Sequence, residues 1–159
     1  MKEKMSKISN GVKEFNYFID SNVFLRPIVK DDPKKLSDCE GFFRQIKKFG
    51  PISFVSDAIL AEIVWVLQSF YKLDRETISG SLIRIINIKN IKVLNGFDVR
   101  EAIDLYQKNN IKFVDGLIAS HPKVQSGEMV VVSYDRDFDK LGIKRQEPAE
   151  VLLSLRKSK

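Results

Sequence analysis

Short continuous apolar runs alternate with longer segments of helical spacing along this chain. The apolar runs 15–19, 52–55, 91–94 and 128–133 predict β-strands, and the last of them is the clearest buried strand. Runs without a polar residue at every second position are typical of strands covered on both faces, as in a parallel sheet. The hydrophobic pattern therefore predicts strands at the centre of the fold.

Between these runs, apolar residues recur at helical spacing. This spacing predicts helices over 33–50, 56–70, 75–87, 98–108, 114–124 and 149–155, with a short helix or turn over 135–141. Strands separated by helices indicate an α/β fold, here a three-layer α/β/α sandwich with a central parallel sheet. We expect one domain over 14–155, preceded by a charged leader at 1–13 and followed by a basic tail at 156–159.

Composition narrows the class of protein. Of the 159 residues, 43% are hydrophobic and 30% are charged, as in globular domains, and no apolar run approaches a membrane span of about 18 residues. The single cysteine, Cys39, excludes an internal disulfide, and the chain start lacks the apolar core of a secretory signal, so we expect a cytoplasmic protein with no membrane partner. The net charge of +6 suits a nucleic acid, although many basic domains bind none.

Acidic side chains stand where a parallel sheet places its ligands. Such sheets bind ligands at the carboxyl ends of their strands. Asp20 follows the first predicted strand, and a group of three acids follows the last one. Glu62 and Asp115 stand within apolar helical segments, where an unpaired acid is costly to bury. The candidate acids are Asp20, Glu62, Asp115, Asp135, Asp137 and Asp139.

Each of these acids also has an ordinary structural interpretation. Asp20 could cap a helix or turn, Glu62 could face solvent, and Asp115 could interact with a helix dipole. The acids after the last strand could be caps or solvated residues. Taken together at strand ends and helix starts, however, they indicate a cluster that needs a divalent cation to offset mutual repulsion.

Carboxylates of this kind fit metal-assisted hydrolysis of phosphodiesters. Mg²⁺ and Mn²⁺ prefer carboxylate and water ligands, and a bound ion activates water. Other chemistries have little support: His121 precedes Pro122 at a helix end, Cys39 has no histidine nearby in sequence, and both are interpreted as structural. One His and one Cys make a zinc site improbable, and no phosphate-binding glycine loop is present.

Four segments around these acids resemble the PIN domain, and within it the VapC-like toxins of type II toxin–antitoxin pairs. They are 18–25 (FIDSNVFL), 60–67 (LAEIVWVL), 113–119 (FVDGLIA) and 131–141 (VVSYDRDFDKL), in family order. The resemblance covers about residues 15–151. It implies a Mg²⁺- or Mn²⁺-dependent endoribonuclease with an RNA substrate. It also implies a homodimer and an antitoxin partner that inserts a segment into the active-site groove.

The resemblance also implies a role for each site residue. Asp20, Asp115 and Asp135 would hold the metal, and Glu62 would hold it or orient the attacking water. Asn22 would bind metal-bound water or phosphate, and Ser133 would orient Asp135. Asp137 would be an outer or second-metal ligand. Arg136 is a substrate candidate, as are four other cations that could steer RNA: Arg26, Lys140, Lys144 and Arg145.

Two departures and two rival interpretations remain open. Gly116 replaces the alanine common after the third acid and would loosen that helix start, and the longer leader leaves an RNA-processing role open. A haloacid dehalogenase-like phosphatase would need an acid where Asn22 stands and would leave Glu62 and Asp115 unexplained. A catalytically idle PIN module that binds RNA or protein would have no reason to keep mutually repelling acids.

Overall fold

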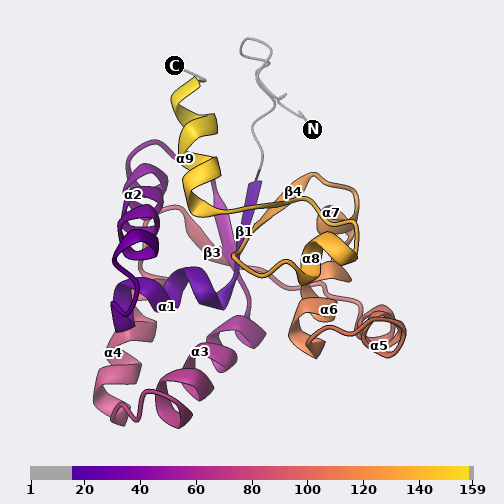
Figure 1. Cartoon of the computed structure of the whole chain (residues 1–159), viewed down its shortest axis with the longest axis horizontal. Coiled ribbons are helices and arrows are strands. Elements are labelled where there is room, and N and C mark those ends of the chain that lie inside the picture. Colours follow the sequence, from indigo (N-terminus) through magenta and orange to yellow (C-terminus); the bar gives the residue numbers. More distant parts are fainter. Residues whose placement is uncertain (1–15, 158–159) are drawn as a thin grey trace, which may run out of the picture.

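The computed structural model describes residues 16–157, and the predicted leader at 1–13 lies outside them. Five parallel strands form one sheet in the order β3-β2-β1-β4-β5 (Figure 1). The strands are β1 (Asn16–Ile19), β2 (Ser53–Val55), β3 (Ile91–Val93), β4 (Met129–Val132) and β5 (Arg145–Gln146). The predicted parallel sheet is therefore confirmed, and its central strand is the first strand of the described residues.

Nine helices within the described residues cover this sheet. They are α1 (Ser21–Val29), α2 (Pro33–Phe49), α3 (Asp57–Ser69), α4 (Arg75–Ile86), α5 (Val99–Lys108), α6 (Phe113–Ala119), α7 (Pro122–Gln125), α8 (Asp137–Lys140) and α9 (Pro148–Lys157). None of the helices in the described part of the chain is both long and apolar enough to span a bilayer.

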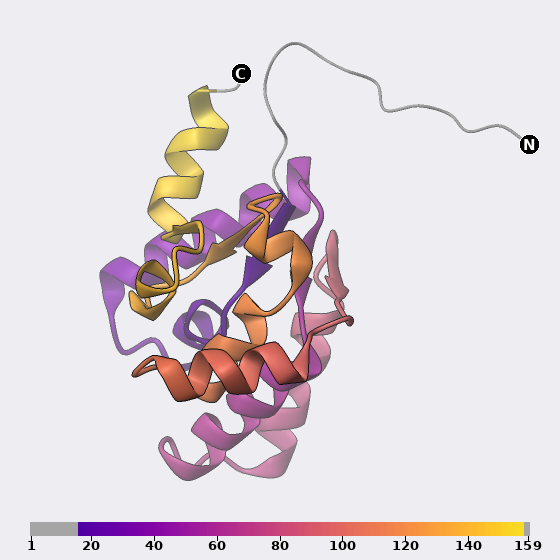
Figure 2. The same cartoon turned by 90° about the vertical axis from the view of Figure 1, so that its right-hand side faces the viewer.

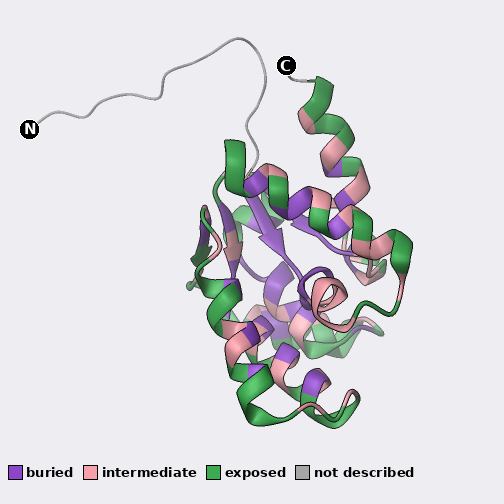
Figure 3. Cartoon of the chain, turned by 90° about the vertical axis from the view of Figure 1, so that its left-hand side faces the viewer, coloured by how far each residue is buried: buried purple, intermediate pink, exposed green. Residues whose placement is uncertain are grey.

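The helices form two layers on either side of the sheet. Helix α2 contacts α1 and α9 on one side, while α5 and α6 pack together on the other. In Figure 1, α2 lies to the left of the sheet and α5, α6, α7 and α8 lie to its right. Figure 2 shows α5 lying across the front of the molecule, below the strands, and Figure 3 shows buried residues concentrated between the layers. This arrangement confirms the α/β/α sandwich.

The core begins with the apolar residues of β1. Phe18 and Ile19 are fully buried, and β1 runs beside β4 with Ile19 opposite Val132. Because both faces of these strands are covered by helices, consecutive residues are apolar rather than alternating. The register fixes which residues emerge together from the carboxyl ends of the two central strands.

Several helices begin with a residue that accepts hydrogen bonds from the first turn. The side chains of Asp32, Ser56, Asp74 and Asp98 accept from backbone N–H groups of α2, α3, α4 and α5 respectively. Such caps satisfy donors that have no partner within the helix. Helix α6 differs, because Lys112 stands at its N-cap position without a side-chain cap.

The predicted helix over 114–124 is wrong in its extent. The structure divides this segment into α6 and α7, with the break at His121. Pro122 lacks a backbone N–H and disfavours helical geometry in the residue before it. His121 is accordingly extended, and its Nδ1 accepts a hydrogen bond from the Lys123 N–H at 3.2 Å, which caps α7.

Other differences lie at positions where the hydrophobic pattern is short or interrupted. Helix α1 contains Pro27 and β5 has two residues, so neither follows from apolar periodicity. The last helix continues to Lys157, so Arg156 and Lys157 are helical rather than part of a separate tail.

Candidate metal-dependent active site

The site starts where the two central strands end. The Asp20 N–H donates to the Val132 carbonyl at 3.0 Å, which continues the pairing of β1 with β4 by one step. Asp20 then begins α1, where its Oδ1 accepts from the Ser21 N–H at 2.7 Å. Asp20 is 3% exposed and Ser133, directly after β4, is fully buried. The sheet register therefore brings Asp20 and Ser133 together although they lie far apart in sequence.

The Ser133 hydroxyl organises these residues. It donates to Asp20 Oδ2 at 2.6 Å and accepts from Asn22 Nδ2 at 3.0 Å and from the Asp135 N–H at 2.9 Å. Asn22 Nδ2 also donates to Asp20 Oδ2 at 2.8 Å, and Asn22 Oδ1 accepts from the Tyr134 N–H at 3.3 Å. A hydroxyl with one donor and two acceptor positions is thus fully used, so it holds Asp20, Asn22 and Asp135 in fixed relation.

Three of the predicted acids converge beside this network. Asp115 near the start of α6, Asp135 after β4 and Asp137 at the start of α8 each place a carboxylate oxygen within 4.8 Å of the other two. Asp135 Oδ1 accepts from the Asp137 N–H at 2.9 Å, which fixes the turn between them. The loop after β4 and the first turns of α6 and α8 therefore form one acidic cluster.

Glu62 reaches the cluster from α3. Its charge raises the pKa of both Asp20 and Asp115, which places its carboxylate close to theirs. Glu62 Oε2 and Asp115 Oδ2 are buried oxygens without a hydrogen-bond partner. Buried acceptors normally have partners, so two unpaired carboxylate oxygens in one cluster indicate a missing positive ligand.

Burial and mutual repulsion dominate the electrostatics. Burial raises the pKa of Asp20 to about 6, against the opposing effect of the Ser133 hydrogen bond. Burial, together with repulsion by Asp20 and Asp135, raises the pKa of Asp115 to about 8. Both shifts follow from collecting carboxylates in a poorly solvated place.

A divalent cation fits this donor set. Hard carboxylate oxygens are the ligands that Mg²⁺ and Mn²⁺ prefer, and an ion among them would satisfy the unpaired oxygens of Glu62 and Asp115. Asp115, Asp135 and Asp137 are placed to hold it together, with Asp20 and Glu62 adjoining. Histidine or cysteine joins no such cluster among the described residues.

Comparison with known proteins identifies the family. The family model for the PIN domain matches residues 17–144, which include most of the sheet and the whole acidic cluster. The chain belongs to the PIN domain family. The resemblance inferred from the four sequence segments is thereby confirmed.

Relatives of this PIN domain support a narrower grouping. A protein of Aquifex aeolicus (strain VF5) described as a VapC ribonuclease is 33% identical over 132 residues, which cover 83% of this chain and 96% of that protein. The crystal structure of PAE2754 from Pyrobaculum aerophilum has a TM-score of 0.62 at 16% identity, covering 90% of this chain and 96% of that one. The match to the Aquifex aeolicus protein places the chain among VapC-type proteins, whereas the likeness to PAE2754 concerns the fold.

Two further crystal structures share the fold. VapBC2 from Rickettsia felis, bound to a DNA fragment from its promoter, has a TM-score of 0.57 at 18% identity, covering 84% of this chain and 98% of that one. Mycobacterium tuberculosis VapC20, described as a toxin that cleaves the sarcin–ricin loop, has a TM-score of 0.59 at 15% identity, with coverages of 80% and 95%. At these identities the likeness concerns the fold alone.

Sequence reasoning missed one residue at the site of this PIN domain. Lys112 Nζ lies 3.4 Å from Asp135 Oδ2. Lys112 precedes Asp115 by three residues, so the two side chains lie on the same side of the helix start. That spacing was the available signal, but a single lysine between Ile111 and Phe113 looks like an ordinary surface residue.

Most of the cations considered for RNA steering have intramolecular partners. Arg145 binds both carboxylate oxygens of Asp139 at 3.0 Å, so this acid faces away from the cluster. Lys140 donates to Asp137 Oδ1 at 2.6 Å. Arg26 lies on α1 and donates to Asp31 Oδ1 at 2.7 Å. Arg136 precedes α8 and is exposed, so it remains available to a ligand.

His121 and Cys39 lie outside the acidic cluster. His121 caps α7, and its ring packs edge-on against Phe97 with centroids 5.3 Å apart. The Cys39 thiol lies within the core, 3.5 Å from the Tyr134 hydroxyl, and burial raises the pKa of this thiol to about 11. Such a thiol is inert as a nucleophile at neutral pH.

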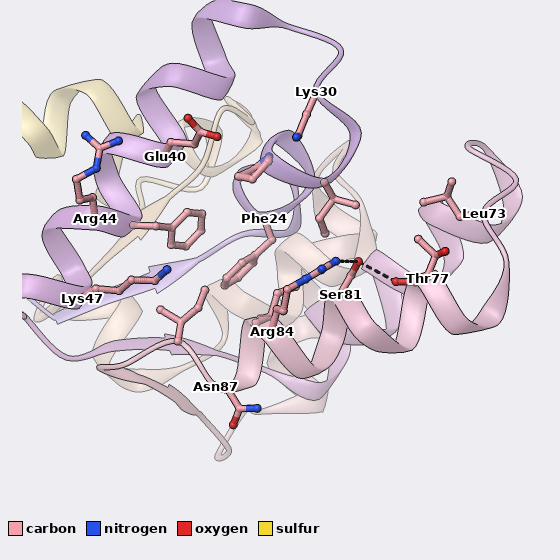
Figure 4. A pocket seen from close by; sticks show the side chains of 15 residues that line it. Phe24, Lys30, Glu40, Arg44, Lys47, Leu73, Thr77, Ser81, Arg84 and Asn87 are labelled. Carbon is pink, nitrogen blue, oxygen red and sulfur yellow. Dashed lines mark hydrogen bonds between the residues drawn. The ribbon is translucent and has the colours of Figure 1, made fainter.

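A hollow of about 920 Å³ lies elsewhere on the PIN domain, between α1, α2 and α4. Figure 4 shows the Phe24 side chain within it and the charged ends of Lys30, Arg44 and Lys47 around it. Arg84 donates to Ser81 Oγ at 3.1 Å on its α4 side. The hollow is connected to the acidic cluster through α1, which carries Asn22 near its start and Phe24 two residues further on.

Proposed function

We propose that this chain is a metal-dependent endoribonuclease of the VapC type. The observation that carries the proposal is the acidic cluster itself. Acids from four parts of a PIN fold converge, and Glu62 and Asp115 each leave a buried carboxylate oxygen unpaired. The relative described as a VapC ribonuclease, matched over most of both chains, supports RNA as the substrate.

The proposed roles follow from placement. Asp20, Asp115, Asp135 and Asp137 would hold Mg²⁺ or Mn²⁺, and Glu62 would hold it or orient the attacking water. When bound, the ion would lower the pKa of a water molecule and stabilise charge on the leaving oxygen.

The neighbouring polar residues would position these acids and the substrate. Ser133 and Asn22 would fix the Asp20 carboxylate through the hydrogen bonds described above, and Ser133 would also fix the backbone of Asp135. Arg136, exposed at the rim, would contact the RNA backbone.

The decisive experiment measures RNA cleavage in Mn²⁺, in Mg²⁺ and in EDTA. We expect metal-dependent cleavage by the native chain and its loss in Asp20→Asn and Asp115→Asn. Asp104→Asn on the exposed side of α5 is the matched control and should cleave normally. Cleavage that persists in EDTA would contradict the proposal. The proposal would also be contradicted if the native chain did not cleave RNA and its Tm did not rise on adding Mn²⁺. That result would favour a catalytically idle binding module.

We further propose an antitoxin partner. The hollow between α1, α2 and α4 combines an apolar interior with lysine and arginine side chains at its edge, which fits an amphipathic partner segment with acidic residues. VapBC2 from Rickettsia felis is one of the crystal structures that share the fold. The product of a short neighbouring gene should co-purify with the native chain and less with an Arg44→Glu, Lys47→Glu variant. Equal recovery, or an RNA-processing pattern of products without any such partner, would count against this part.

We place the protein in the cytoplasm, where its proposed RNA substrate and divalent ion are both found. We also propose that it forms a homodimer. Its support is a row of exposed apolar side chains on α5: Val99, Ile103 and Tyr106 are each at least half exposed. Phe113 extends this row, packing edge-on against Tyr106 with centroids 6.0 Å apart. Neighbouring exposed apolar residues of this kind are typical of protein interfaces.

A further inference from the structure

Lys112 occupies a position that its chemistry does not suit. It is the N-cap residue of α6, where the side chains of other helices accept hydrogen bonds from the first turn. An ammonium group has no acceptor, and a cation at a helix start is opposed by the partial positive charge of the unpaired N–H groups. Lys112 therefore contributes less to α6 than Ser, Asp or Asn would at the same place.

At this position Lys112 gains an attraction to the acidic cluster. Its Nζ lies 3.4 Å from Asp135 Oδ2, which is long for a charged hydrogen bond, and its side chain is 63% exposed. An exposed ion pair of this kind contributes little to stability, although the charge of Lys112 opposes the rise in the pKa of Asp20 and Asp115. A residue that breaks a local capping rule and faces a cluster of acids points to function.

The surroundings of Lys112 suggest what it would bind. RNA must bring a negatively charged phosphate to a cluster of carboxylates that repel it. Lys140, the other lysine at the cluster, is already held by Asp137 at 2.6 Å. Lys112 is more loosely held at the solvent side of Asp135, so its ammonium keeps donors free for a second anion.

We propose that Lys112 is a substrate-binding residue of this site, whose ammonium donates a hydrogen bond to a backbone phosphate oxygen of the RNA strand beside the acidic cluster. The proposal rests on the ribonuclease function proposed above. It assigns to Lys112 a contact with the sugar–phosphate backbone, which positions the strand without reading its sequence.

This role predicts opposite effects on the two ligands of the site. Removing the charge should weaken RNA binding, because a phosphate contact is lost. The same change should strengthen Mn²⁺ binding, because the ammonium no longer competes for Asp135. A merely structural role of Lys112 at the start of α6 would weaken both or change neither.

The experiment compares Lys112→Gln, Lys112→Arg and the control Lys123→Gln. Lys123 is an exposed lysine on α7, which precedes β4 and so lies at the opposite end of the sheet from the cluster. Three quantities are measured: kcat and KM for a single-stranded RNA in Mn²⁺, RNA affinity in EDTA against salt concentration, and the Mn²⁺ Kd by calorimetry without RNA.

We expect Lys112→Gln to raise KM about tenfold with a much smaller change in kcat, and to reduce the salt dependence of RNA binding by about 0.7 in log–log slope. The Mn²⁺ Kd should fall severalfold. Lys112→Arg should restore KM, and Lys123→Gln should resemble the native chain in all three. Unchanged KM and salt slope in Lys112→Gln, or weaker Mn²⁺ binding, would overturn the proposal.

The two proposals fail in different ways. If the native chain cleaves RNA and Lys112→Gln behaves like Lys123→Gln, the ribonuclease function stands and the role of Lys112 is wrong. If no protein cleaves RNA but Lys112→Gln alone loses salt-dependent RNA affinity, the role of Lys112 stands on a site that binds without cutting. Absence of both cleavage and RNA binding in the native chain overturns both.

Discussion

At the scale of single residues, the Ser133 hydroxyl holds three residues of the site in fixed positions. It is fully buried and joins one carboxylate, one side-chain amide and one backbone N–H. Every hydrogen-bonding position of the group is used, so no single partner can move without breaking a contact. Hydrogen bonds with uncharged hydroxyl, amide and backbone groups therefore position the acids around it before any cation binds.

Ser133→Ala should impair both stability and activity. It leaves the Asn22 amide and the Asp135 N–H short of a buried acceptor, at a cost of about 1–3 kcal/mol. We expect Tm to fall by about 5 °C and kcat to fall about tenfold. Ser79→Ala on the exposed side of α4 is the control and should change neither by much. A normal kcat in Ser133→Ala would show that Asp20 is positioned by other contacts.

The raised pKa values of Asp20 and Asp115 predict how stability depends on pH without metal. The folded protein holds protons on these acids up to pH values of about 6 and about 8, whereas unfolded carboxyls lose them near their ordinary value of 3.8. Stability from these groups is therefore present below about pH 4 and is lost as pH rises toward 8.

In EDTA, Tm should fall by about 5 °C between pH 5 and pH 8. Asp115→Asn should flatten this decline because the group with the larger shift no longer titrates. Mn²⁺ should oppose the decline most strongly at the upper end, since ion binding requires deprotonated ligands. A Tm that rises with pH in EDTA for the native chain would contradict the assignment of these pKa shifts.

At the scale of elements, the contact between α5 and α6 depends on Gly116. A Cβ at this position would lie 3.0 Å from the Ala102 carbonyl oxygen, which is tighter than nine in ten real Cβ contacts. From the sequence alone, Gly116 is expected to loosen the helix start. The structure gives it a different role, because the missing side chain lets α5 approach the helix that carries Asp115.

Gly116→Ala should therefore destabilise the protein even though alanine favours helices. We expect a loss of about 1–3 kcal/mol in the free energy of unfolding from overpacking, measured by urea titration. Gly80→Ala is the matched control on α4, where a Cβ meets nothing within 4 Å, and should be neutral or stabilising by up to about 1 kcal/mol. Equal effects of the two substitutions would show that α5 can shift to accept the new side chain.

The elements also mark the limit of what the sequence could predict. The buried strands were predictable because Phe18, Ile19 and the valines of β4 need no partner to reveal their burial. The gathering of Asp20 with the acids after β4 at one end of the sheet followed from the rule for parallel strands. Two features could not be predicted from hydrophobic spacing. The break at His121 depends on Pro122, and the helix α1 contains Pro27. Lys112 was missed because only its contact with Asp135, which is remote in sequence, places it at the site.

At the scale of the whole molecule, the exposed apolar side chains of α5 bear on assembly. The proposed homodimer predicts that Ile103→Glu shifts the chain toward monomer in sedimentation velocity, since a charge would be buried at the interface. Ile83→Glu on α4 is matched in exposure, 56% against 50% for Ile103, and should leave the assembly state unchanged. A native chain that sediments as a monomer at all concentrations would exclude the homodimer.

The order of the strands also affects when the protein can act. β1 precedes its partner β4 and the acids Asp135 and Asp137 by more than a hundred residues. A nascent or truncated polypeptide that ends before residue 129 lacks both the neighbour that positions Asp20 and two of the five acids of the cluster. Under the proposed function, such a polypeptide should not cleave RNA, so the activity would begin only after the ribosome has passed this segment.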